Sequence, residues 1–212
     1  MEQDTLFQAS ARSVGRLGLA LALDPALYAW AAENDLDALF LHRVFYLDRG
    51  ALPADMGILA CHLPFDEHLT PGCSPLLAER MGLGTLAALG EKEGRPLGMI
   101  GPVSPVPQEV FVQRLTHLFG GLEDVTPGQA ETVSCVAVMG AMTDALVREA
   151  AARGAQIYVT GQQRAPARDA VQETGLGVVA VGHRRGEEYG LRLLAELLRA
   201  QFPLLDVRIF AP

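Results

Sequence analysis

The stretch Gly182–Gly190 reads GHRRGEEYG, and it marks the junction between a predicted strand and a predicted helix. It follows an apolar run, Val178–Val181, that is typical of a buried strand, and it precedes the helical pattern of Leu191–Leu198. Glycine at position 182 permits a sharp exit from the strand, because glycine adopts backbone angles that other residues avoid. We therefore expect a strand–turn–helix unit, which is the building block of an α/β sheet.

Two side chains of this stretch could act together. His183 and Glu187 are four residues apart, so one turn of helix would place an imidazole and a carboxylate on the same face. Such a pair can bind a transition metal. The pair could equally be a histidine that caps the helix beside an unrelated surface glutamate, so the metal interpretation needs support from the rest of the chain.

Composition argues against several classes of protein. The chain has 212 residues, of which 50% are hydrophobic, and a formal net charge of -8. A chain of this length can bury a core as one domain or as two closely packed lobes. The negative charge argues against binding to nucleic acid or to an anionic membrane surface, because both need basic patches.

Targeting, membrane and disulfide signals are not evident in the sequence. The opening residues, MEQDTLFQ, lack the basic and apolar regions of a signal peptide. The longest apolar run, Leu17–Trp30, is interrupted by Asp24 and Pro25 and is shorter than the roughly 20 residues that span a bilayer. The three cysteines are widely spaced and form no CxxC motif, which favours neither a disulfide framework nor a zinc knuckle. We expect a cytoplasmic protein.

Strand and helix patterns alternate in two parts of the chain, residues 16–84 and 131–212. In the first part we expect strands at 17–23, 37–41 and 56–61 and helices at 25–34 and 74–81, with a loop containing Asp66 before the second helix. In the second part we expect strands at 133–139, 157–159, 178–181 and 206–210 and helices at 143–153, 167–173 and 191–198. This alternation predicts an α/β fold with mixed sheets flanked by helices.

Residues 85–130 are interpreted as an intervening lobe between the two halves. They are expected to form a hairpin at 85–89 and 97–100, a prolyl segment at 102–107, a helix at 109–119 and a polar loop at 120–128. The first fifteen residues are expected to form a short helix. Together these segments predict a single unit over residues 1–212, made of two intimately packed halves.

Polar side chains follow several of the predicted strands. His42, His62 and His183 each come directly after a strand, and Asp66 follows His62 by four residues. In an open α/β sheet, ligands bind beyond the carboxyl ends of the strands. Histidine and carboxylate groups gathered at such an edge favour Zn, Mn or Fe. The remaining histidines are interpreted as a loop residue and a helix-face residue, His68 and His117.

Other catalytic motifs are missing from the sequence. It has neither the glycine-rich GxxxxGK of a P-loop nor the GxSxG of a nucleophile elbow. Cys61 lies beside His62, but adjacent strand residues point to opposite faces, so we expect Cys61 in the core.

The order of these motifs resembles the Nif-three-like proteins, also called GTP cyclohydrolase I type 2-like proteins. The likeness extends from about residue 16 to 200. The matching segments are Asp37–His42 (DALFLH), His62–Asp66 (HLPFD), Leu77–Leu83 (LAERMGL), Tyr158–Gly161 (YVTG) and Gly182–Glu187 (GHRRGE).

The resemblance implies two related α/β halves, a toroidal homohexamer and a dinuclear divalent-metal site that faces the internal cavity. The family's metal ligands fall on His42, Asp66, His183 and Glu187. His62 matches a histidine near the metals that could serve as a catalytic base. We therefore expect Zn, Mn or Fe, with one or two ions per chain.

The sequence departs from the family at two site positions. The family usually has a second histidine where this chain has Arg43, and arginine has no lone pair to offer a metal. The family's Thr-Gly-Asp appears as Thr160-Gly161-Gln162. We hypothesise that one metal of the pair is lost and that the Arg43 guanidinium supplies positive charge there, pairing with Asp66 or Glu187. Alternatively, Arg43 points to solvent and a nearby group replaces the lost ligand.

Two interpretations of function stay open at this point. The first is a metal-dependent hydrolase acting on a small substrate, for which Arg164, Arg184 and Arg185 could form a basic rim suited to phosphate. These arginines could equally make surface or subunit contacts. The second is a non-catalytic metal-binding or regulatory scaffold with a degenerate site. A GTP-processing activity rests on the family label alone, because the sequence has no purine-binding signature.

Overall fold

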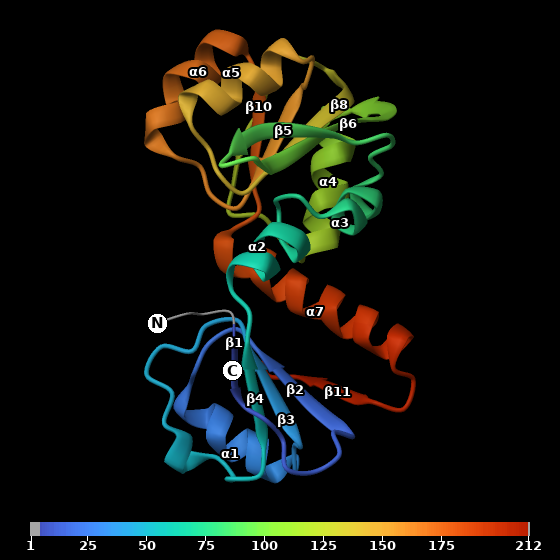
Figure 1. The fold of residues 1–212 in the computed structure, drawn as a ribbon. Helices are drawn as coiled ribbons and strands as arrows, with labels where there is room; N and C mark the ends of the chain where they lie inside the picture. The colour runs from blue at the N-terminus through green and yellow to red at the C-terminus, as the bar shows by residue number, and fades with distance from the viewer. Residues whose placement is uncertain (1–4, 212) are drawn as a thin grey trace. The chain divides into compact units, whose positions relative to one another are not determined.

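The structure is a computed structural model that describes residues 5–211 (Figure 1). The chain divides into two compact units. The first comprises the chain up to Phe65 together with Gly190 onward, and the second comprises Asp66–Tyr189. The chain passes from one unit to the other within two helices, α2 (Leu63–Leu69) and α7 (His183–Gln201). That the halves form a single packed unit stays a prediction.

The first unit is built on a five-stranded sheet. Its strands lie in the order β1 (Thr5–Gln8), β4 (Gly57–Ala60), β3 (Ala38–Leu41), β2 (Arg16–Ala20) and β11 (Asp206–Ile209). Strands β4, β3, β2 and β11 are parallel, and β1 pairs with β4 in the antiparallel sense. A short 3-10 helix, Arg49–Ala51, lies in the connection between β3 and β4. The mixed sheet confirms the predicted fold class.

Helix α1 (Pro25–Glu33) packs its buried residues Leu27 and Ala31 into the same core as strand residues of this sheet. The helix begins where the sequence predicts. The Asp24 side chain accepts a hydrogen bond from the Ala26 backbone N–H at 2.8 Å, and Pro25 occupies the first turn, where its missing N–H costs nothing.

Both edges of this sheet depend on pairing that local sequence patterns do not reveal. The short helix expected in the first fifteen residues is wrong over the described part, because β1 pairs Leu6 with Leu59, a residue more than 50 positions away. Residues 1–4 of that expectation lie outside the described chain. Strand β11 pairs Val207 with Leu17 of β2, so the end of the chain completes the first sheet.

The second unit is built on a six-stranded mixed sheet. Its strands lie in the order β5 (Ala87–Lys92), β6 (Arg95–Pro107), β8 (Thr132–Met139), β9 (Ile157–Thr160), β10 (Gly177–Ala180) and β7 (Asp124–Thr126). Strands β8, β9 and β10 are parallel, and the other pairings are antiparallel. Residues 85–130, expected as an intervening lobe, thus contribute three strands to this sheet.

Helices cover both faces of the second sheet (Figure 1). One face carries α5 (Asp144–Ala152) and α6 (Arg168–Thr174), which share a core with Tyr158 and Val178 of the strands. The other face carries α4 (Gln108–Phe119), with α3 (Pro75–Met81) beside it. The 3-10 turn Ala165–Ala167 precedes α6.

Three local expectations in this unit are wrong. The polar loop expected at 120–128 contains strand β7, which pairs with β10. The strand expected to end at Ile100 continues through the prolines to Pro107. Proline has no backbone N–H to donate, and the regular pairing of β6 with β8 is interrupted between Pro102 and Val106, where the prolines can be accommodated. The loop expected around Asp66 begins as the short helix α2.

Among the described residues, no helix is both long and apolar enough to cross a bilayer.

Candidate metal centre

His42 is the buried anchor of the candidate centre. It follows β3 directly, and its backbone N–H donates to the Ala20 carbonyl at 3.0 Å, which extends the sheet pairing by one residue. Its side chain is fully buried, and Nδ1 lies 3.2 Å from the Cys61 carbonyl oxygen. A carbonyl only accepts, so Nδ1 carries the proton and Nε2 carries the lone pair that a metal needs.

His62 and Asp66 lie at the end of the adjacent strand, β4. His62 precedes helix α2, and its ring centroid lies 4.7 Å from that of His42, with an interplanar angle of 41°. Asp66 lies within α2, four residues after His62, so the two side chains are close along the chain. Parallel strands β3 and β4 bring the two histidines to one sheet edge, as the sequence predicts.

The three side chains converge to form a group that could hold a metal ion. One donor atom each from His42, His62 and Asp66 lies within 4.8 Å of the other two. His42 is buried, and the other two are half-buried. Two imidazoles with one carboxylate fit the preferences of Zn, Mn or Fe, and three protein ligands are typical of a catalytic zinc site with an open position. His62, predicted as a base, is therefore also a candidate ligand.

His183 and Glu187 pair on the first turn of α7. Gly182 before them has a φ of 93°, which confirms the predicted glycine-dependent exit from the strand. Nε2 of His183 lies 2.9 Å from Oε1 of Glu187, so the expected shared helix face is confirmed. The Glu187 side chain is 4% exposed, whereas that of His183 is 56% exposed. That these two residues belong to the same site as His42 stays a prediction.

Several backbone segments of the second unit surround this pair. A side-chain carbon at Gly161, just after β9, would lie 3.9 Å from the His183 Cα. One at Gly186 would lie 3.0 Å from the Pro71 ring, and Pro71 is five residues beyond Asp66. The carboxyl ends of β9 and β10 and the segment that follows Asp66 therefore meet around the start of α7, all within the second unit.

Arg184 and Arg185, on α7, already have hydrogen-bond partners. Arg184 Nε donates to Glu188 at 2.8 Å, and Arg185 donates to the Val181 carbonyl at 3.1 Å. Arg43 is half-buried directly after His42, and its backbone N–H donates to Leu21 at 2.8 Å. The roles predicted for these arginines toward a phosphate or a lost ion therefore stay predictions.

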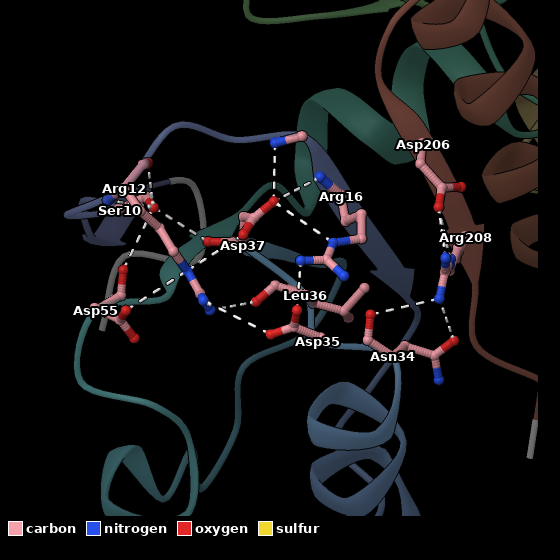
Figure 2. Close-up of polar contacts among 11 residues, drawn as sticks. Ser10, Arg12, Arg16, Asn34, Asp35, Leu36, Asp37, Asp55, Asp206 and Arg208 are labelled. Carbon is pink, nitrogen blue, oxygen red and sulfur yellow. Dashed lines mark hydrogen bonds and ion pairs between the residues drawn. The ribbon is translucent and has the colours of Figure 1, made fainter.

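Asp37, the first residue of the DALFLH motif, belongs to a different network (Figure 2). Its Oδ2 accepts hydrogen bonds from the backbone N–H groups of Gly15 and Arg16, at 2.9 and 2.8 Å. Its Oδ1 lies 3.3 Å from Nε of Arg12, whose guanidinium also donates to the Leu36 carbonyl at 2.7 Å. These contacts hold the chain before β2 against the amino end of β3.

These contacts also change the acidity of Asp37. The hydrogen bond from Gly15, then that from Arg16, and the charges of Arg12 and Arg16 lower the pKa of Asp37 against the opposing effect of burial. Five residues of extended chain, about 16 Å, separate it from His42. Asp37 therefore stabilises the amino edge of the sheet, while His42 lies at the carboxyl edge.

One participant in the centre is not predicted from the sequence. Phe65 is 2% exposed, and its ring centroid lies 4.6 Å from that of His42 at 37°. The available signal is its position in helix α2, three residues after His62 and directly before Asp66. That signal becomes readable only once residues 63–69 are known to be helical.

Comparisons with known proteins extend these observations. The profile of the Duf34/NIF3 (NGG1p interacting factor 3) family matches residues 47–211. The matched range contains His62, Asp66, His183 and Glu187, whereas His42 precedes it. A protein of Deinococcus radiodurans named GTP cyclohydrolase 1 type 2 homolog is 27% identical over 203 residues, covering 87% of this chain and 76% of that protein. The Pseudomonas aeruginosa protein of the same name is 23% identical, covering 94% and 84%.

Solved structures have the same architecture. Protein ybgI, described as of unknown function, superposes with a TM-score of 0.76 at 25% identity, covering 99% of this chain and 89% of that one. TTHA1606 from Thermus thermophilus gives a TM-score of 0.72 at 23% identity, covering 99% and 90%. The fold expected from the motifs is confirmed.

Proposed function

The chain belongs to the Duf34/NIF3 family, and on that premise we propose that it binds a divalent metal and hydrolyses a small, phosphate-bearing substrate. One observation carries the proposal, namely the convergence of His42, His62 and Asp66 on a point at the carboxyl edge of the sheet. The fold makes this edge the expected place for a ligand. Zn, Mn and Fe all suit the donor set.

The side chains are assigned as follows. His42 and Asp66 hold the ion together with His183 and Glu187, and His62 is either a further ligand or the catalytic base. When bound, a divalent ion supplies Lewis acidity and lowers the pKa of water. The Cys61 carbonyl fixes the His42 tautomer, which keeps Nε2 as the ligating atom. His62 is also the candidate base, because a histidine can accept a proton near neutral pH when its lone pair is not given to a metal.

Metal content tests the binding site directly. We expect protein purified without chelator to carry one ion per chain by elemental mass spectrometry, and His42→Ala and Asp66→Asn to lose it. His117→Ala and Asp169→Asn change exposed residues on α4 and α6 and should keep the ion. Absence of metal from the unaltered protein would refute the proposal. Two tightly held ions would refute only the idea that Arg43 replaces one of them.

Hydrolysis of a panel of phosphomonoesters and phosphodiesters tests the activity. We expect metal-dependent turnover that His183→Ala abolishes, and turnover that survives this substitution would remove His183 from the site. His62→Ala separates the two roles of that residue. Loss of the ion assigns it as a ligand, whereas a retained ion with lost turnover assigns it as the base.

A second candidate function is a non-catalytic metal-binding or regulatory scaffold. The observation that favours it is Arg43, a cation directly after His42 where the family usually has a further histidine. Full metal occupancy with no turnover across the panel would support this candidate over the hydrolase.

We also propose that the chain assembles as a hexameric ring. The family resemblance supports this assembly, and no nucleic-acid or membrane partner is proposed for a chain with a net charge of -8. Light scattering coupled to size-exclusion chromatography should give six times the 22.7 kDa of one chain. A monomer at micromolar concentration would contradict the ring.

A further inference from the structure

Four rings contact one another in series, each tilted against the next, at the carboxyl edge of the first sheet. Phe40 lies in β3 and His42 follows the end of that strand; because they are two residues apart, their side chains extend from the same face. Phe65 lies against both, with ring centroids 5.9 Å from Phe40 and 4.6 Å from His42. His62 lies on His42 at 4.7 Å. The His42 ring is thus in contact with two other rings.

The hydrogen bond to the Cys61 carbonyl contacts the His42 ring at Nδ1, at one edge of the imidazole, and its length of 3.2 Å is at the long end for a nitrogen donor. Packing against the ring constrains its tilt in addition to this contact. Phe65 is 2% exposed and supplies that packing from a helix, which is more rigid than a loop.

Phe65 also connects two candidate ligands through its backbone. It directly precedes Asp66 within α2, so the helix that places its ring against His42 also carries the Asp66 carboxylate. One buried side chain therefore links an imidazole and a carboxylate that come from different elements. An aliphatic side chain would fill part of the space without presenting a flat face to the imidazole.

We infer that Phe65 is a positioning residue of the metal centre, which keeps the His42 ring and the Asp66 carboxylate correctly placed relative to each other. This inference rests on the proposed function, because it presupposes that His42 and Asp66 bind an ion. It assigns to Phe65 a role beyond its contribution to the core.

Titration with Co²⁺ tests this role, since the visible spectrum of Co²⁺ reports the geometry of its ligands. We expect Phe65→Leu to weaken Co²⁺ binding by about tenfold or more and to alter the absorption bands. Phe111→Leu is the matched control, because Phe111 is a fully buried phenylalanine on α4 of the second unit. It should leave both the affinity and the spectrum as in the unaltered protein.

The outcomes separate this inference from the proposed function. If the unaltered protein fails to bind Co²⁺, the proposed function fails. If it binds and Phe65→Leu matches Phe111→Leu in affinity and spectrum, only the role of Phe65 is overturned. Circular dichroism of the metal-free variants verifies folding. Phe65→Met, which has an unbranched, flexible side chain that can adapt to the site but lacks the ring, carries the same test if Phe65→Leu is unfolded.

Discussion

At the scale of single residues, the carboxylate of Asp37 joins the segment before β2 to the start of β3. The negative charge strengthens its two backbone hydrogen bonds and is required for its ion pair with Arg12. Hydrogen bonds to a charged group contribute about 1.5–3 kcal/mol, so Asp37→Asn should destabilise the protein by about 2 kcal/mol at neutral pH.

The lowered pKa of Asp37 predicts how this effect varies with pH. The stabilisation is complete above the unfolded value of about 3.9 and is lost as pH falls through the lower folded value. The difference in unfolding free energy between the unaltered protein and Asp37→Asn should therefore shrink below about pH 4. Urea titrations at several pH values measure it, with the exposed Asp169→Asn as control. A constant difference down to pH 2 would contradict the assignment.

Gly182 is the second residue whose replacement has a defined cost. Its φ of 93° disfavours any side chain, and an added Cβ would lie 3.1 Å from Nη1 of Arg185. Gly182→Ala should lower the free energy of unfolding by about 1–2 kcal/mol. Gly94 has a φ of 77° and open space around it, so Gly94→Ala measures the cost of the left-handed backbone conformation alone. Equal losses in urea unfolding would show that Arg185 moves aside without cost.

At the scale of elements, short-range signals specify some helices well. For α1, an aspartate cap and a proline in the first turn mark the start, and the sequence alone predicts it. For α2, the residue before the helix is His62 rather than one of the usual capping types, and the helix has only seven residues, so the sequence is interpreted as a loop. The start of this helix is therefore less clearly marked in the sequence than the start of α1.

The cap of α1 offers a direct test. Asp24→Ala should lower the free energy of unfolding by about 1 kcal/mol, because the Ala26 N–H loses its acceptor. Asp24→Asn is the matched variant, since asparagine caps about as well as aspartate. Thermal unfolding should therefore rank the unaltered protein and Asp24→Asn together, above Asp24→Ala. Loss of stability in both variants would show that the charge matters more than the hydrogen bond.

At the scale of the whole molecule, a ligand that binds only the folded chain stabilises it by mass action. Metal at about 100 times its dissociation constant should contribute about 2.7 kcal/mol. For a chain of this size that corresponds to a rise in Tm of roughly 5–10 °C. Differential scanning fluorimetry with Zn²⁺ or Mn²⁺ measures it. His42→Ala should lose the rise and His117→Ala should keep it; an equal rise in both would place the ion elsewhere.

The sequence by itself determines the α/β class, most of the strands and helices, and the family. It also points to His42, His62 and His183, which come just after apolar strands, while Asp66 and Glu187 enter as candidates through their spacing and the family resemblance. The roles of these five residues stay predictions. The predictions of secondary structure succeed where the signal is local, since a strand, a cap or a glycine turn depends on neighbouring residues.

Only the tertiary structure decided which of these residues meet. The pairing of β1 with β4 and of β11 with β2, the strand that runs through the prolines to Pro107, and the contact of Phe65 with His42 join residues whose proximity depends on packing. It also places Asp37 at the amino end of β3, about 16 Å along the extended chain from His42, although both residues belong to the DALFLH motif. The physical reason is that a motif lists neighbours along one strand, whereas contacts between elements depend on how those elements pack.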